Sequence, residues 1–246
     1  MPGPARTNRL GNVIAAELVK LCTLPAAALT AIGTVLVSAA LMAASAAAAA
    51  DEGLAVSATD VTLNLVPLVQ SGAVLLGILS VSHEYAGTQH RTTLLAVPGR
   101  GLLLAGKTVA ATIALALVAV ATVSVGAAAA AIVQRLLDAP AEALEPWRLA
   151  GAACYLTLIG MLSYAAALLV RHLIPALVGM LSLVLLLPPL VAALTEHARW
   201  LPGLAGMQLY DSTDAVLTAG TGTLVLAAWI LLVGAVAATR FLRTDA

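Results

Sequence analysis

Residues 102–134 read LLLAGKTVAATIALALVAVATVSVGAAAAAIVQ, an apolar run in which Lys107 is the only charged residue. The run exceeds the roughly 20 residues that a helix needs to cross a bilayer. Its alanine and leucine content favours a helix, because strands are enriched in aromatic and β-branched residues. We therefore predict a membrane-spanning helix over these residues.

Five further apolar stretches flank this run, at 24–50, 61–82, 149–170, 173–194 and 223–239. The whole chain has 246 residues, of which 61% are hydrophobic and 10% charged, and its mean hydropathy is +1.03. Soluble domains carry about 25% charged residues. The composition excludes a soluble catalytic domain and predicts an all-α integral membrane protein with six membrane-spanning helices, in a six-span domain over 24–246. The net charge of zero offers no reason to expect a nucleic-acid partner.

The basic residues are distributed unevenly between the two predicted sides. If the N-terminus is cytoplasmic, nine of the 12 Lys and Arg residues fall on the cytoplasmic side. The other three are Arg135, Arg148 and Arg199. Because loops rich in Lys and Arg stay inside, we predict that both termini are cytoplasmic. Residues 44–46 (ASA) resemble a signal-peptide cleavage site, but the first span is about twice as long as the usual signal core.

The first 23 residues contain apolar side chains at helical spacing: Leu10, Val13, Ile14, Leu18 and Leu21. We predict an amphipathic helix that lies in the inner membrane interface. Glu17 interrupts its apolar stripe. This carboxylate either pairs with Lys20, three residues on, or faces protein rather than lipid.

Two connecting segments are long and patterned. The cytoplasmic segment 83–100 reads HEYAGTQHRTTLLAVPGR, and an external segment covers 195–222. Pro188 and Pro189, ahead of the external segment, are expected to break or kink the fifth span because they lack an N–H. Residues 200–203 (WLPG) break the chain again. The external segment should form short helices that re-enter the membrane or lie over its outer mouth.

Few residues in the sequence suggest a catalytic or ligand-binding site. Residues 101–108 (GLLLAGKT) match the Walker A pattern letter for letter, yet they open a membrane helix without the preceding strand that a phosphate-binding loop needs. We therefore predict no nucleotide site in this chain, and we expect no catalytic residue, metal or cofactor. Asn64 and Gln70 are strongly polar residues within a predicted span. They either bond neighbouring helices, the reading we favour, or touch a substrate.

Segment 82–88 (SHEYAGT) is followed by RTTLL at 91–95 and then by Pro98, Arg100 and Lys107. This order resembles the loop between the second and third spans of ABC-2 type permeases. Residues 17–20 (ELVK), 201–209 and 239–246 resemble other parts of the same family. The resemblance implies that the loop is a cytoplasmic coupling helix, with the following working residues: Glu84, Gly87, Thr88, Arg91 and Arg100.

The same resemblance implies a membrane subunit that binds a separate ATPase subunit, which holds ATP and Mg²⁺, and a second permease, identical or not. The cargo would be a drug, antibiotic, lipid or peptide exported across a bacterial inner membrane. Two other classes remain open from the sequence: a channel or ion-driven carrier, and a membrane scaffold. The uncharged spans argue against the carrier, because carriers usually hold ionisable residues inside the membrane.

Overall fold

A computed structural model describes residues 9–85, 100–139, 143–211 and 216–244, and every structural statement below refers to these ranges. Within them the chain is helical and contains no strand. The elements are α1 (Arg9–Thr23), α2 (Pro25–Asp51), α3 (Ala58–Tyr85), α5 (Arg100–Leu136), α6 (Pro146–Val170), α7 (Leu173–Leu181), a π-helical turn (Ser182–Leu186), α8 (Leu187–Ala192), a 3₁₀ turn (Glu196–Trp200), α9 (Pro202–Met207) and α10 (Ala219–Thr244).

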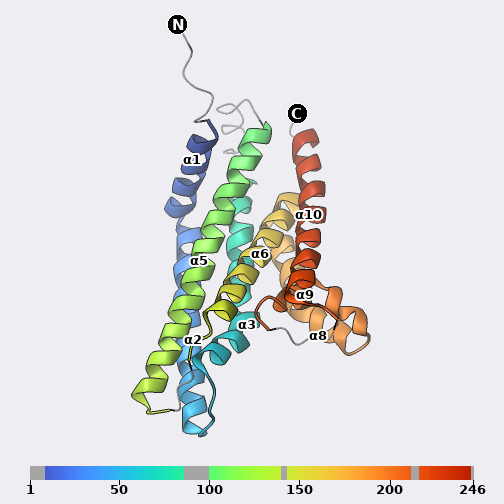
Figure 1. Cartoon of the computed structure of the whole chain (residues 1–246). Coiled ribbons are helices and arrows are strands. Elements are labelled where there is room, and N and C mark those ends of the chain that lie inside the picture. The colour runs from blue at the N-terminus through green and yellow to red at the C-terminus, as the bar shows by residue number, and fades with distance from the viewer. Residues whose placement is uncertain (1–8, 86–99, 140–142, 212–215, 245–246) are drawn as a thin grey trace.

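Six stretches in the described residues are long and apolar enough to cross a membrane. They are Pro25–Asp51, Ala58–Ser82, Gly101–Leu136, Pro146–Val170, Leu173–Ala192 and Ala219–Arg240. Helices that could cross a membrane cover all six predicted spans, and their ends shift by a few residues at most. The fold is that of a multi-pass membrane protein. Because the number of spans is even, α1 begins and α10 ends at one end of the bundle, here called the terminal end (Figure 1). The opposite end is called the distal end.

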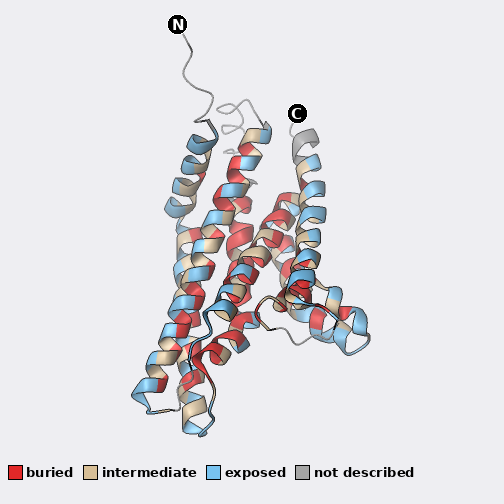
Figure 2. Cartoon of the chain, in the orientation of Figure 1, coloured by how far each residue is buried: buried red, intermediate tan, exposed pale blue. Residues whose placement is uncertain are grey.

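Helices α3 and α6 form the centre of the bundle, as the concentration of buried residues on them in Figure 2 illustrates. In the most apolar part of each, 61% of residues are buried, against 17% in α2 and α10. The outer helices expose leucine, isoleucine and valine side chains. Such exposed apolar side chains fit a lipid environment, because lipid tails are as apolar as leucine.

The two central helices touch backbone to backbone at Gly77. A Cβ atom added to Gly77 would lie 2.2 Å from the carbonyl oxygen of Gly160 on α6. Gly160 in turn faces Leu115 of α5, with 2.6 Å between its ideal Cβ and a leucine methyl carbon. In membranes, where helices gain little from the hydrophobic effect, such small residues permit the close packing that holds them together.

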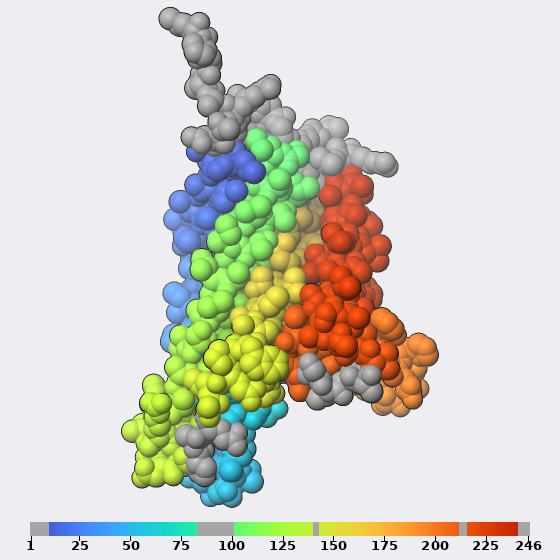
Figure 3. Space-filling model, in the orientation of Figure 1, coloured from blue at the N-terminus to red at the C-terminus, as the bar shows by residue number. Residues whose placement is uncertain are grey.

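Helices α2 and α5 run side by side and extend past the other helices at the distal end (Figures 1 and 3). Helix α5 has 37 residues, which corresponds to about 55 Å at 1.5 Å per residue. A bilayer core is about 30 Å thick. Part of α5 must therefore project beyond the membrane core or tilt strongly within it.

The fifth span is not broken at Pro188 and Pro189, which were predicted to break or kink it, but its helix is disturbed there. Pro188 and Pro189 open α8, and the chain stays helical through the π turn just before them. The Leu187 amide bonds the Ser182 carbonyl, five residues back. A π turn is wider than an α turn, and it gives the proline rings room that an α-helix lacks. The span is therefore locally widened rather than ended.

The described part of segment 195–222 contains the predicted short helices. Leu201 is extended, with φ −67° and ψ 144°, between the 3₁₀ turn and α9. The Trp229 indole N–H of α10 donates to the Trp200 carbonyl at 3.1 Å. A Cβ on Gly222 would lie 2.2 Å from the Ala205 carbonyl oxygen. These contacts seat the segment against the start of α10.

Gly77→Ala should destabilise the protein, because its methyl group would force α3 away from the α6 backbone. Overpacking of this kind costs about 1–3 kcal/mol. We expect a lower thermal midpoint in detergent, measured by unfolding of the purified chain. Gly234→Ala on α10 is the control, because nothing lies within 4 Å of its ideal Cβ. An equal midpoint for the two variants would contradict this account of the core.

Candidate functional site

A buried ion pair joins α1 to α5 near the terminal end. The Glu17 carboxylate lies 3.3 Å from the Lys107 ammonium nitrogen, and their side chains are only 10% and 5% exposed. Beside the pair, a Cβ on Gly106 would lie 2.5 Å from a methyl carbon of Val13. The glycine thus lets the two helices approach closely enough for the charges to meet.

The ion pair selects one of the two predicted alternatives for Glu17, and it changes the predicted placement of α1. Glu17 faces protein, which is the second of the two predicted alternatives, and its carboxylate pairs with Lys107 of α5. Helix α1 also lies lengthwise along α5, in place of lying across the end of the bundle (Figure 1). Lys107 lies inside a span, where an uncompensated buried charge is strongly destabilising, so pairing with Glu17 of α1 stabilises this arrangement. Burial lowers the pKa of Lys20, the charge of Lys107 lowers it further, and Glu17 acts in the opposite direction.

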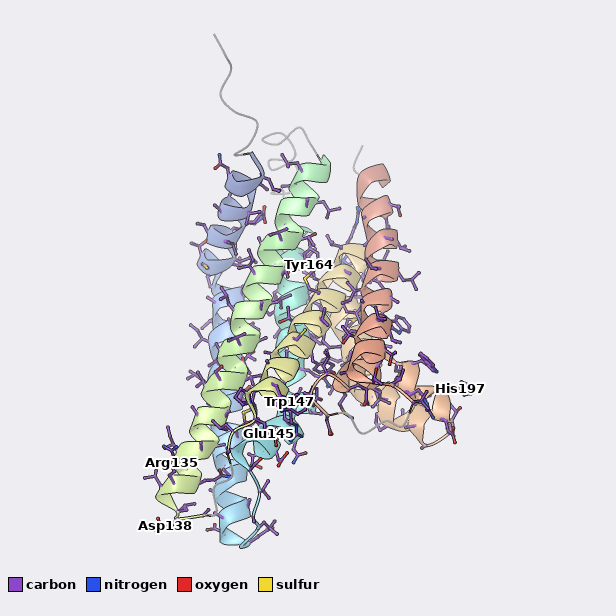
Figure 4. All side chains as sticks on the ribbon, viewed as in Figure 1. Arg135, Asp138, Glu145, Trp147, Tyr164 and His197 are labelled. Carbon is purple, nitrogen blue, oxygen red and sulfur yellow. The ribbon has the colours of Figure 1, made fainter. Side chains whose placement is uncertain are left out.

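The Walker-like segment is helical, as predicted. All of it, residues 101–108, lies in the first turns of α5. Its lysine bonds Glu17. The Thr108 hydroxyl donates to the Leu104 carbonyl at 2.8 Å and lies 3.2 Å from the Tyr164 hydroxyl of α6, whose place in the bundle is labelled in Figure 4. Both polar side chains therefore serve helix contacts.

The proposed coupling residues fall at the edge of the described structure. Glu84 belongs to the last turn of α3, and Arg100 is the first residue of α5. Gly87, Thr88 and Arg91 lie outside the described residues. The end of α3 and the start of α5 lie at the terminal end (Figure 1).

Gln70 and Asn64, the two polar span residues, have different environments. Gln70 is buried, and its amide nitrogen donates to the Pro67 carbonyl at 2.8 Å. The Tyr155 hydroxyl of α6 donates to the Gln70 side-chain oxygen at 2.5 Å. Gln70 therefore bonds a neighbouring helix, the interpretation favoured from the sequence. Asn64 is exposed on the surface of α3.

A polar network at the distal end was not predicted. The Arg148 guanidinium donates to the Asp60 carboxylate at 2.9 Å and to the Tyr210 carbonyl at 3.1 Å. The Asp60 amide donates to the Ser57 hydroxyl at 3.0 Å, which begins α3 with a side-chain cap. Figure 4 labels Glu145, whose carboxylate lies 3.5 Å from Arg148. The three-residue spacing of Ser57 and Asp60 is a helix-start signal that the sequence itself contains. The contact between Arg148 and Tyr210 has no such signal, because only the fold brings these residues together.

The comparisons with known proteins leave the family open. No protein-family model matches the chain, and no curated protein matches it either. Function therefore has to be argued from the residues and the fold.

Removing one partner of the buried ion pair should be costly. We expect Glu17→Met or Lys107→Met alone to reduce the free energy of unfolding by about 3–5 kcal/mol, because either leaves a buried charge unpaired. The double variant should recover most of that loss. The measurement is a double-mutant cycle on the purified protein in detergent.

The exposed pair of Glu196 and Arg199 provides a matched control, since its atoms also lie 3.3 Å apart. Glu196 is 91% exposed, and surface pairs contribute about 1 kcal/mol or less. Equal costs for the two pairs, or additive single effects at Glu17 and Lys107, would show that the buried pair does not couple α1 to α5.

Proposed function

We propose that this chain is the permease subunit of an ABC-2 type exporter in a bacterial inner membrane. A separate ATPase subunit would supply the energy, and a second permease would complete the transport pathway. The observation that carries the proposal is the 82–100 sequence, with its SHEYAGT and RTTLL motifs, between the second and third of six spans. The cargo would be a drug, antibiotic, lipid or peptide.

The distribution of basic residues supports a cytoplasmic position for the terminal end. Four described basic side chains lie toward the terminal end: Lys20, Lys107, Arg171 and Arg240. Arg240 donates to the Leu169 carbonyl at 3.0 Å, which ties the end of α10 to the end of α6. The distal end holds Arg135, Arg148 and Arg199, of which Arg148 is paired with Asp60 and Glu145, and Arg199 with Glu196. Positive charge at the terminal end favours a cytoplasmic position for it, where an ATPase subunit would bind.

The scarcity of charged residues in the described spans supports an energy source that is separate from this chain, as the proposed ATPase subunit would be. Lys107 is the one charged residue placed well inside the described spans, and Glu17 neutralises it. Proton- and ion-driven carriers hold ionisable side chains along their pathway. An ATPase partner fits a bundle that has no such chain of groups in its described spans.

Asn64 supports a second permease. Its amide is exposed on the chain's own surface, in a helix otherwise apolar enough to cross the membrane. An amide that faces lipid without a hydrogen-bond partner costs a few kcal/mol. A second permease packed on this face of α3 would cover it.

Cysteine labelling tests the proposed orientation. In a chain that carries Cys22→Ser and Cys154→Ser, we expect His197→Cys to react with a membrane-impermeant maleimide in intact cells. Gly11→Cys on α1 should react only after permeabilisation. Both positions are exposed, so exposure does not distinguish them. The reverse pattern would place the terminal end outside the cell.

Capture of an ATPase tests the proposed partner. We expect the tagged permease to retain a stand-alone ABC ATPase encoded beside it, when the two are expressed together and purified. Glu84→Ala and Gly87→Val should each lower the retained amount several-fold, because they alter the proposed coupling loop. Arg199→Ala, at the distal end, is the control. Retention unchanged by both loop variants would mean that the loop is a passive connector.

A further inference from the structure

A cavity of about 320 Å³ opens at the distal end, between α3, α6, α8, α9 and the π turn. Its exposed rim contains Pro67, Pro189 and Ala192, and its buried wall contains Gln70, Tyr155 and Val184. This size lies at the lower end of the range of small-molecule sites, about 300–1,000 Å³. The cavity belongs to one chain and needs no second subunit to form.

The buried wall of the cavity carries hydrogen-bond acceptors, and the first is the Tyr155 oxygen. Tyr155 donates its hydroxyl hydrogen to Gln70, and its oxygen keeps lone pairs that can accept a hydrogen bond. The Tyr210 ring lies 5.4 Å from the Tyr155 ring, between centroids, and is tilted by 60°. This packing holds Tyr155 in place, so its oxygen is a fixed acceptor.

The π turn adds a second acceptor. Pro188 and Pro189 occupy the positions whose amides would bond the Val184 carbonyl in an α-helix or a π-helix. The Leu187 amide bonds the Ser182 carbonyl instead. The Val184 carbonyl therefore loses its helical donors, in a residue that is 4% exposed and lines the cavity. A π turn within a helix frequently marks a functional site.

No charged side chain lines this cavity among the described residues. A carboxylate or an ammonium ligand would be buried there without a counter-charge, which is costly. An uncharged molecule that donates a hydrogen bond avoids this penalty.

We propose that this cavity binds a small uncharged amphipathic molecule, an alcohol in its simplest form. Its hydroxyl donates to the Val184 carbonyl or the Tyr155 oxygen, and its apolar body packs against Leu185, Leu204 and Met207. Binding depends on the folded chain alone, so it does not rest on the proposed ATPase partner.

Photolabelling of the full chain in phosphatidylcholine vesicles tests the site. The probe is a decanol that carries a chain diazirine, compared with the decanoic acid and decyltrimethylammonium analogues. We expect saturable labelling of residues 184–189 and 203–207 by the alcohol probe, competed by unlabelled decanol. Tyr155→Phe should weaken that competition up to about tenfold, the loss of one hydrogen bond.

A matched pair of tryptophan variants controls for lipid labelling. Ala192→Trp fills the rim and should abolish the saturable labelling. Ala193→Trp, at the next exposed position and outside the cavity lining, should leave it intact. Labelling spread evenly over lipid-facing helices, or labelling that Ala192→Trp leaves unchanged, would overturn the proposal. Equal labelling by all three probes would overturn it too.

Discussion

A polar group inside a bilayer has no water to bond, so the protein itself must satisfy it. The Glu17–Lys107 ion pair is the strongest instance of this constraint in the chain. Lys107 lies inside a span and cannot be left unpaired, so an acidic residue from α1 meets it. The same constraint explains why the Gln70 amide bonds both its own helix and Tyr155 of α6.

Close packing between helices brings the partners of these polar contacts within bonding distance. Gly106 lets α1 approach α5, and Gly77 brings α3 onto the α6 backbone. With α3 and α6 fixed, Arg148 can reach both Asp60 and the Tyr210 carbonyl, and the segment around Tyr210 is held at the distal end. Burial raises the pKa of Tyr210, and the neighbouring Asp211 carboxylate raises it further. Tyr210 therefore stays neutral beside the cavity.

The long apolar helices could be predicted from the sequence, whereas contacts between residues far apart in the sequence could not. Runs such as 102–134 determine the spans because length and apolarity suffice for that prediction. The pattern of α1 showed that Glu17 breaks an apolar stripe, but its partner is 90 positions away in the sequence. Pro188 and Pro189 indicated a local disturbance, and the choice of a π turn over a break depends on tertiary packing against α9. The proposed coupling residues Gly87, Thr88 and Arg91 lie outside the described ranges and remain predictions.

The central claim is that α1 is docked along α5 by the buried ion pair. A disulfide between Val13→Cys and Gly106→Cys tests it most directly, because an ideal Cβ on Gly106 lies 3.1 Å from the Val13 Cβ. Disulfide-bonded residues have Cβ atoms about 3.5–4.5 Å apart, so a small adjustment suffices. In native membranes, with Cys22 and Cys154 replaced by Ser, we expect rapid and nearly complete cross-linking on mild oxidation. Adding Lys107→Met should slow it. Absence of the cross-link in the paired variant, with both thiols still reactive, would contradict the account and place α1 away from α5.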